Sequence, residues 1–122
     1  MADDAADIMA TVMDYWEGWF LGDAERMQRA LHPDFAKTGV GIDEAGQPTN
    51  ASMTAPDMVG WTSAGQGQQE STVDFTAEVT IDDQYHHIAT VTVRSGIYRE
   101  YLHVMHTADG WKLPHALYMR VR

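Results

Sequence analysis

The chain has 122 residues and a formal charge of −10, and it contains no cysteine. The length predicts one domain over residues 1–122, large enough to bury roughly two-thirds of its unfolded surface. The lack of cysteine excludes disulfides, thiolate metal sites and cysteine nucleophiles, and the acidic balance disfavours nucleic acid as a partner. No apolar run approaches the ~18 residues of a membrane span, and the first residues are acidic where a signal peptide would be basic, so we expect a cytoplasmic protein with no membrane partner.

The first half of the chain predicts three helices. Two adjacent apolar rows run along Asp4–Leu21, and their combined width indicates a helix that is covered on more than one side. Gly22 suits the end of this helix, Asp23 suits the N-cap of the next, and Pro33 follows that second helix. The elements expected after the first helix are a helix over Ala24–Leu31, a strand over Phe35–Ile42, a polar loop over Asp43–Ser52, a helix from the Thr54 cap to about Trp61, and a mobile Gly/Gln-rich segment over Ser63–Gln69.

From Ser71 onward the apolar residues alternate with polar ones, which predicts strands. Short clusters of turn residues separate the alternating runs, so we expect three consecutive hairpins and an antiparallel meander. The predicted strands cover Ser71–Ile81, Tyr85–Val93, Ile97–Thr107 and Trp111–Arg120.

The segment DYWEGWFLGDAERMQRALHPDFAK (residues 14–37) and the ending GWKLPHALYM resemble the nuclear transport factor 2-like superfamily, within it most closely the bacterial group labelled "putative lumazine-binding". The resemblance implies an α+β fold in which N-terminal helices pack in the concavity of a strongly curved antiparallel sheet, the cone-like barrel also seen in polyketide cyclases and ketosteroid isomerase. It specifies the fold better than the chemistry, because that superfamily contains isomerases, dehydratases, hydrolases and non-catalytic modules.

Tyr15 is the first candidate catalytic residue. Its spacing from Gly22 and Asp23 is similar to that of the ketosteroid isomerase tyrosine that donates a hydrogen bond to the developing oxyanion, an enzyme whose chemistry is well described. The isomerase's general base would fall near Gly39 and its protonated aspartate near Leu102, where this chain has no carboxylate. We therefore do not expect steroid isomerisation. The alternative is that Tyr15 is a core aromatic whose hydroxyl is satisfied.

His115 is the second candidate, because strand alternation places it on one face with Trp111, Leu113, Leu117 and Met119. If that face looks into the cone, the imidazole and the Tyr15 hydroxyl would form an acid–base pair. The alternative is a hydrogen-bonded core histidine. A two-residue turn at residues 108–110 would place His106 with His115, whereas a three-residue turn would place His103 there.

The pocket that these groups would line is expected to bind a flat, partly apolar ligand. Met58 and Trp61 belong to the third helix, which in the superfamily covers the mouth of the cone; the alternative is that this helix plugs the sheet without forming a pocket. The predicted substrate-binding residues are Trp19, Met58, Trp61, His87, Leu102 and Met119. The six histidines have no diagnostic metal-ligand spacing, so we expect no metal, and we expect no organic cofactor.

The sequence thus predicts a small-molecule enzyme that performs proton transfer on a compact, partly apolar or aromatic substrate, as an isomerase, dehydratase, cyclase or hydrolase does. Tyr15 and His115 would be its donor and base, in an enzyme of the lyase or isomerase type. The alternative is a non-catalytic ligand-binding or dimerisation module of the same fold. We also expect a homodimer that pairs through the outer face of the sheet, with Ile88, Tyr98 and Tyr118 in the contact.

Overall fold

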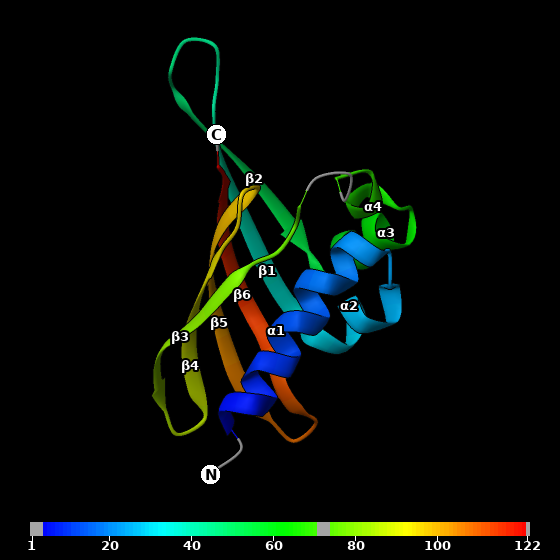
Figure 1. The fold of residues 1–122 in the computed structure, drawn as a ribbon, viewed down its shortest axis with the longest axis vertical. Coiled ribbons are helices and arrows are strands. Elements are labelled where there is room, and N and C mark those ends of the chain that lie inside the picture. The colour runs from blue at the N-terminus through cyan, green and yellow to red at the C-terminus, as the bar shows by residue number, and fades with distance from the viewer. Residues whose placement is uncertain (1–3, 71–73, 122) are drawn as a thin grey trace.

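The structure is a computed structural model that describes residues 4–70 and 74–121. Over those residues it forms helices on one side of a curved sheet (Figure 1). No helix in these two ranges is both long and apolar enough to cross a membrane. The elements, in chain order, are α1 (Asp4–Leu21), α2 (Ala24–Ala30), β1 (Leu31–Ile42), β2 (Pro48–Thr54), α3 (Ala55–Ser63), α4 (Gln66–Glu70), β3 (Glu78–Tyr85), β4 (Ile88–Arg94), β5 (Tyr98–Thr107) and β6 (Gly110–Arg120).

The sheet has the strand order β2-β1-β6-β5-β4-β3 and does not close into a barrel. All neighbouring strands are antiparallel except β1 and β6, which pair in parallel. The predicted α+β class is confirmed, and the sheet is mixed rather than purely antiparallel. A parallel pair is possible here because β1 and β6 are joined by a long stretch of chain and not by a hairpin.

Helix α1 lies across the concave face of the sheet, and α2, α3 and α4 gather beside one of its ends (Figure 1). Its buried side chains include Ile8, Val12, Trp16 and Phe20, and they form one core with the inward residues of the strands. The wide apolar stripe of the sequence is therefore explained by a helix that contacts both the sheet and the neighbouring helices.

The helix ends follow the predicted capping residues. Gly22 ends α1 in the left-handed region, with φ of 69°, which glycine adopts without strain. The Asp23 side chain accepts a hydrogen bond of 3.1 Å from the backbone N–H of Arg26 at the start of α2. Thr54 and Asp57 form a capping box at the start of α3, in which each side chain accepts from the other's backbone N–H.

Three predicted elements differ in the structure. Residues 48–54 form β2 instead of a polar loop, because they pair with β1 from Ala36 to Ile42. Gln66–Glu70 forms the short helix α4 in a segment predicted to be mobile. Residues 74–77 have no regular structure, and β3 instead continues through the predicted turn at residues 82–84 with a bulge. The first residues of that predicted strand, 71–73, lie outside the described residues.

Candidate functional site

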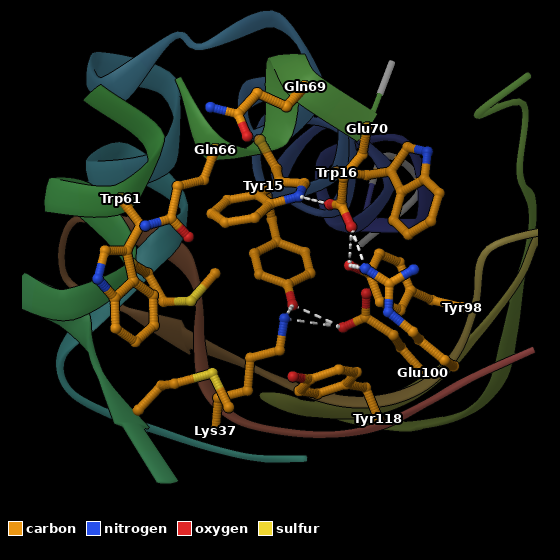
Figure 2. A pocket seen from close by; sticks show the side chains of 14 residues that line it. Tyr15, Trp16, Lys37, Trp61, Gln66, Gln69, Glu70, Tyr98, Glu100 and Tyr118 are labelled. Atoms are coloured by element: carbon orange, nitrogen blue, oxygen red, sulfur yellow. Dashed lines mark hydrogen bonds and ion pairs between the residues drawn. The ribbon is translucent and has the colours of Figure 1, made fainter. Parts of the chain in front are cut away.

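A cavity of about 570 Å³ opens between the concave face of the sheet and the helices α1, α3 and α4. Its walls are largely aromatic and sulfur-containing, and polar groups converge on its floor (Figure 2). A concave site that combines aromatic walls with convergent polar groups is typical of a small-molecule site.

Three buried side chains form a hydrogen-bonded chain on the floor of the cavity, and they come from three different elements. The Tyr15 hydroxyl of α1 donates to the Glu100 carboxylate of β5 over 2.6 Å. The Lys37 ammonium of β1 donates to the Tyr15 hydroxyl and lies 3.5 Å from Glu100 Oε1 (Figure 2). Lys37 is 8% exposed and Glu100 is 2% exposed. A buried ion pair of this kind needs further hydrogen bonds, and the Tyr15 hydroxyl provides one to each partner.

Burial shifts the pKa values of Tyr15 and Lys37. Removal from water, and then the neighbouring Glu100 carboxylate, raise the pKa of Tyr15 well above its ordinary value, so the phenol is neutral and keeps its proton. Burial lowers the pKa of Lys37, while the Glu100 carboxylate opposes that change. The Lys37 ammonium also lies 4.4 Å from the centre of the Tyr118 ring, a cation–π contact that stabilises its charged form.

A second carboxylate, Glu70 at the end of α4, ties the helices to the sheet at the mouth of the cavity. Its two oxygens accept from Trp19 Nε1 over 2.8 Å and from the Tyr98 hydroxyl over 2.6 Å. The Arg120 guanidinium forms an ion pair with the same carboxylate. The Trp19 ring is therefore held in one orientation on the cavity wall.

Of the residues predicted from the sequence to bind substrate or act on it, four line this cavity together: Tyr15, Trp19, Met58 and Trp61. Met58 and Trp61 lie on α3, which covers one side of the cavity as expected (Figure 2). The roles of these four residues stay predictions.

His115 does not line the cavity that Tyr15 lines, so the prediction that these two side chains lie together is wrong. Its side chain is exposed on the convex face of the sheet, where its Nδ1 lies 3.3 Å from Nδ1 of His103. This histidine pair lines a shallow groove of about 360 Å³ together with Tyr85, Ile88 and Pro114.

A β-bulge explains the error. His103 pairs with His115 and Met105 with Lys112, so Val104 of β5 faces two residues of β6, Leu113 and Pro114. The extra residue exchanges the inward and outward positions of β6 beyond the bulge. Leu113 is therefore buried whereas His115 is exposed. Proline lacks the N–H that a ladder requires and is tolerated at such a bulge. The turn at residues 108–109 has two residues, yet the bulge still brings His103 rather than His106 opposite His115.

The other predicted substrate-binding residues also lie outside the cavity. His87 is exposed in the turn between β3 and β4, with its ring 5.2 Å from that of His106. Leu102 is buried in the core beside the cavity, and Met119 is 38% exposed on the convex face. Within the described residues, no group of three or more His, Asp or Glu side chains stands close enough to hold a metal ion.

The predictions placed Tyr98 and Tyr118 on the outer face, but both line the cavity, which corrects that part of the expected dimer contact. Tyr118 lies over Gly39, where a β-carbon would come within 2.6 Å of the ring. Glycine at this position therefore makes room for the aromatic side chain that contacts the Lys37 ammonium.

Lys37 and Glu100 are the two functional candidates that sequence reasoning missed. Each lies two residues before a position where a carboxylate was sought: Lys37 before Gly39 and Glu100 before Leu102. Residues two apart in a strand lie on the same face of the sheet. Lys37 and Glu100 therefore point to the side where the general base and the protonated aspartate of the isomerase were expected. The available signal was a charged residue at an inward position of an alternating strand, as in Glu100-x-Leu102-x-Val104.

Comparisons with known proteins agree with this architecture. The family described as "Putative lumazine-binding" matches residues 3–119. No curated protein matches the chain. Similar solved structures include a nuclear transport factor 2-like protein of unknown function from Silicibacter pomeroyi, with 15% identity, a TM-score of 0.69 and coverage of 98% of this chain and 97% of the other. A cystatin-like fold protein from Burkholderia xenovorans has 16% identity, a TM-score of 0.65 and coverage of 98% and 92%. At these identities the likeness shows the fold alone.

Proposed function

The chain belongs to the "Putative lumazine-binding" family of nuclear transport factor 2-like domains, and we propose that its cavity binds a compact, partly aromatic small molecule and performs proton transfer on it. The family description favours a flat heteroaromatic ligand, and the aromatic walls of the cavity suit one. In this proposal the acid–base groups are Tyr15, Lys37 and Glu100, which replace the Tyr15–His115 pair expected from the sequence.

The observation that carries the proposal is the buried triad on the floor of the cavity. Burying Lys37 and Glu100 takes two charges out of water, which a purely structural core achieves more easily with apolar side chains of similar volume. Burial raises the pKa of Tyr15 and lowers the pKa of Lys37, and perturbed titratable groups in a cavity are typical of functional sites. The neutral Tyr15 phenol would donate a hydrogen bond to a developing negative charge on a bound ligand.

The triad also provides a path for protons. Because the Tyr15 hydroxyl accepts from Lys37 and donates to Glu100, a proton can move from the amine to the carboxylate by a shift along two hydrogen bonds. A ligand atom near the Tyr15 hydroxyl would thus face both a donor and a base. Isomerisation, dehydration and cyclisation all require such a pair.

The first experiment is mass spectrometry of small molecules that denaturation releases from natively purified protein. The compound, or a heteroaromatic analogue of it, is then titrated while the tryptophan fluorescence is followed, since Trp16, Trp19 and Trp61 line the cavity. Absence of any bound compound, and of binding by a panel of flat heteroaromatic compounds, would contradict the proposal.

Two variants separate binding from proton transfer. We expect Tyr15→Phe to lower turnover by about 10²- to 10⁴-fold, the usual contribution of one general acid or base, while the affinity changes far less. Tyr85→Phe is the matched control, because that tyrosine is exposed on β3. If Tyr15→Phe binds ligand normally and no proton-transfer reaction is found with the wild-type protein, the non-catalytic ligand-binding module is the better description.

We further propose that the protein is a homodimer that pairs through the convex face of the sheet. Ile88, Tyr101 and Leu117 are each about half exposed there, and Tyr101 pairs directly with Leu117 across β5 and β6. Tyr101 and Leu117 are thus adjacent exposed apolar side chains, and contiguous apolar surface of this kind is typical of an interaction surface. The cytoplasmic location stays a prediction from the sequence.

A further inference from the structure

Lys37 is a buried lysine whose side-chain nitrogen faces the cavity, and acid–base chemistry alone does not require a lysine at this position. It is one of two lysines in the chain, and the other, Lys112, is a partly exposed surface residue whose ammonium donates to the Arg29 carbonyl. Lys37 instead presents its nitrogen to the cavity from the floor (Figure 2). A lysine that is buried in this way shifts its pKa readily and can act as a nucleophile.

Titratable and charged groups from four elements share the cavity with Lys37. They are Tyr15 on α1, Glu70 on α4, Glu100 and Tyr98 on β5, and Tyr118 and Arg120 on β6. The two carboxylates raise the pKa of the Lys37 amine, but burial outweighs them and the net direction is downward. The cavity therefore favours the neutral amine more than water does.

We propose that Lys37 forms a Schiff base with an aldehyde or ketone, so that the substrates of this cavity are carbonyl compounds with an aromatic or apolar body. This inference rests on the proposed function, because it assigns a substrate class to the same cavity. The distinguishing feature is geometric: the amine, a neutral phenol and a carboxylate meet within hydrogen-bonding distance at the bottom of an aromatic enclosure of about 570 Å³.

The triad supplies each proton that the reaction needs. The Lys37 ammonium first transfers a proton to Glu100, and the neutral nitrogen attacks the carbonyl carbon, forming a C–N bond while the C=O electron pair moves to oxygen. A proton then passes from nitrogen to that oxygen through the Tyr15 hydroxyl. The new hydroxyl takes the proton held by Glu100 and leaves as water, and the nitrogen electron pair forms the C=N bond. Ammonium and carbonyl thus become iminium and water, with no oxidant or reductant.

The iminium links this step to proton transfer. Its positive nitrogen withdraws electrons through the C=N carbon, so a hydrogen on the carbon attached to that C=N carbon becomes acidic. Glu100 is again a carboxylate after water has left, and it lies beside the nitrogen to accept that hydrogen as a proton. Isomerisation or dehydration of an aldehyde or ketone would follow from the resulting enamine.

The test uses the intact wild-type protein, benzaldehyde as the probe and sodium cyanoborohydride to reduce the imine. Peptide mapping by mass spectrometry compares benzyl groups on Lys37, on Lys112 and on the N-terminal amine in the same molecule. We expect Lys37 to be labelled at least about tenfold faster than Lys112 near neutral pH, because burial favours its neutral amine and because Tyr15 and Glu100 supply the acid and base of imine formation. In the urea-denatured chain the two lysines should be labelled equally. Equal labelling in the folded protein, or labelling of Lys112 alone, would overturn the inference.

Matched variants separate this inference from the proposed function. Lys112→Arg should keep the fast labelling, and Lys37→Arg, which keeps the positive charge but cannot form an imine, should lose it. Benzaldehyde binding is followed in parallel through the cavity tryptophans. Binding without any label on Lys37 contradicts the Schiff base and leaves the proposed function standing. If neither benzaldehyde nor the flat heteroaromatic compounds bind, both are contradicted.

Discussion

On the concave face of the sheet, β1 and β5 each aim one charged side chain inward, whereas on the convex face the neighbouring positions carry histidines and exposed apolar residues. Lys37 and Glu100 are almost wholly buried, yet His103 and His115 are open to solvent. Histidine is the most common general acid or base in enzymes, but in this fold the lysine and the glutamate, and not these two histidines, are isolated from water. Isolation from water shifts a pKa and strengthens electrostatic interactions, so we place the chemistry on the concave face.

The largest expected effect comes from removing the carboxylate of the concave face. Glu100→Ala leaves the Lys37 ammonium buried without its counter-charge, and breaking a buried pair in this way typically costs about 3–5 kcal/mol of unfolding free energy. Urea denaturation of the wild-type and variant proteins at pH 7 measures the change. Glu44→Ala, in the exposed loop between β1 and β2, is the control and should lie within about 0.5 kcal/mol of wild type.

The double variant Lys37→Met/Glu100→Leu sharpens that result. Replacing both charges with apolar side chains removes the unpaired group, so we expect it to recover most of the stability lost in Glu100→Ala. Its cavity should still form but should no longer capture an aldehyde. A Glu100→Ala variant as stable as the wild-type protein would mean that the ion pair is not closed off from water.

The next effect is a dependence of stability on alkaline pH. The folded protein raises the pKa of Tyr15, so this tyrosine stabilises the folded state fully below about pH 10 and loses that contribution as the pH rises further, because the unfolded chain ionises first. Each such group contributes a slope of about −1.4 kcal/mol per pH unit there. Denaturation at a series of pH values should show a steeper alkaline fall for wild type than for Tyr15→Phe.

Two neighbouring groups enter the same titration. Tyr98 and Tyr118 also have raised pKa values, through burial and nearby carboxylates, and they add to the fall in both proteins. The lowered pKa of Lys37 acts in the opposite direction: stability rises with pH until the unfolded lysine has lost its proton near pH 10.4. Equal alkaline slopes in wild type and Tyr15→Phe would show that Tyr15 ionises alike in the folded and unfolded chains.

Local signals in the sequence predicted the first half of this fold well. The bounds of α1 and the caps at Asp23 and Thr54 depend on residues within one or two turns of each other, and the structure has them as expected. The predictions failed where pairing between distant residues decides the outcome. Residues 48–52 form a strand only because β1 lies beside them, and no periodicity in that polar segment indicates it.

The candidate site shows the same limit. Tyr15 belongs to a helix with strong local signals, and its place on the inward face could be read from the sequence. The position of His115 depends on one extra residue of β6 opposite Val104, and strand alternation alone cannot detect such a bulge. Lys37 and Glu100 were detectable as charged residues at inward strand positions, but their mutual contact joins β1 to β5, which are not neighbours in the sheet.

A smaller effect is expected on the convex face, where Leu117→Asp tests the proposed dimer. The substitution places two like charges near a two-fold contact, so we expect at least a tenfold loss of dimer affinity with unchanged ligand binding in the cavity. Light scattering over a range of protein concentrations measures this. Ala6→Asp in the first turn of α1, which adds the same charge to an exposed position on the helix side of the sheet, is the control. A wild-type protein that is monomeric throughout would contradict the dimer.

The smallest effect is expected for His115→Ala, and for that reason it separates the two faces most cleanly. An exposed side chain away from the cavity contributes little, so the unfolding free energy should change by less than about 0.5 kcal/mol. Ligand affinity and turnover should equal those of the wild-type protein, in contrast to Tyr15→Phe. Both are measured with the ligand recovered from native protein, and His103→Ala serves as the matched variant for the other ring of the pair. Because the bulge at Leu113 and Pro114 alone turns His115 away from the cavity, a loss of turnover in His115→Ala would mean that β6 adopts the opposite register when ligand binds, and the chemistry would then return to the imidazole.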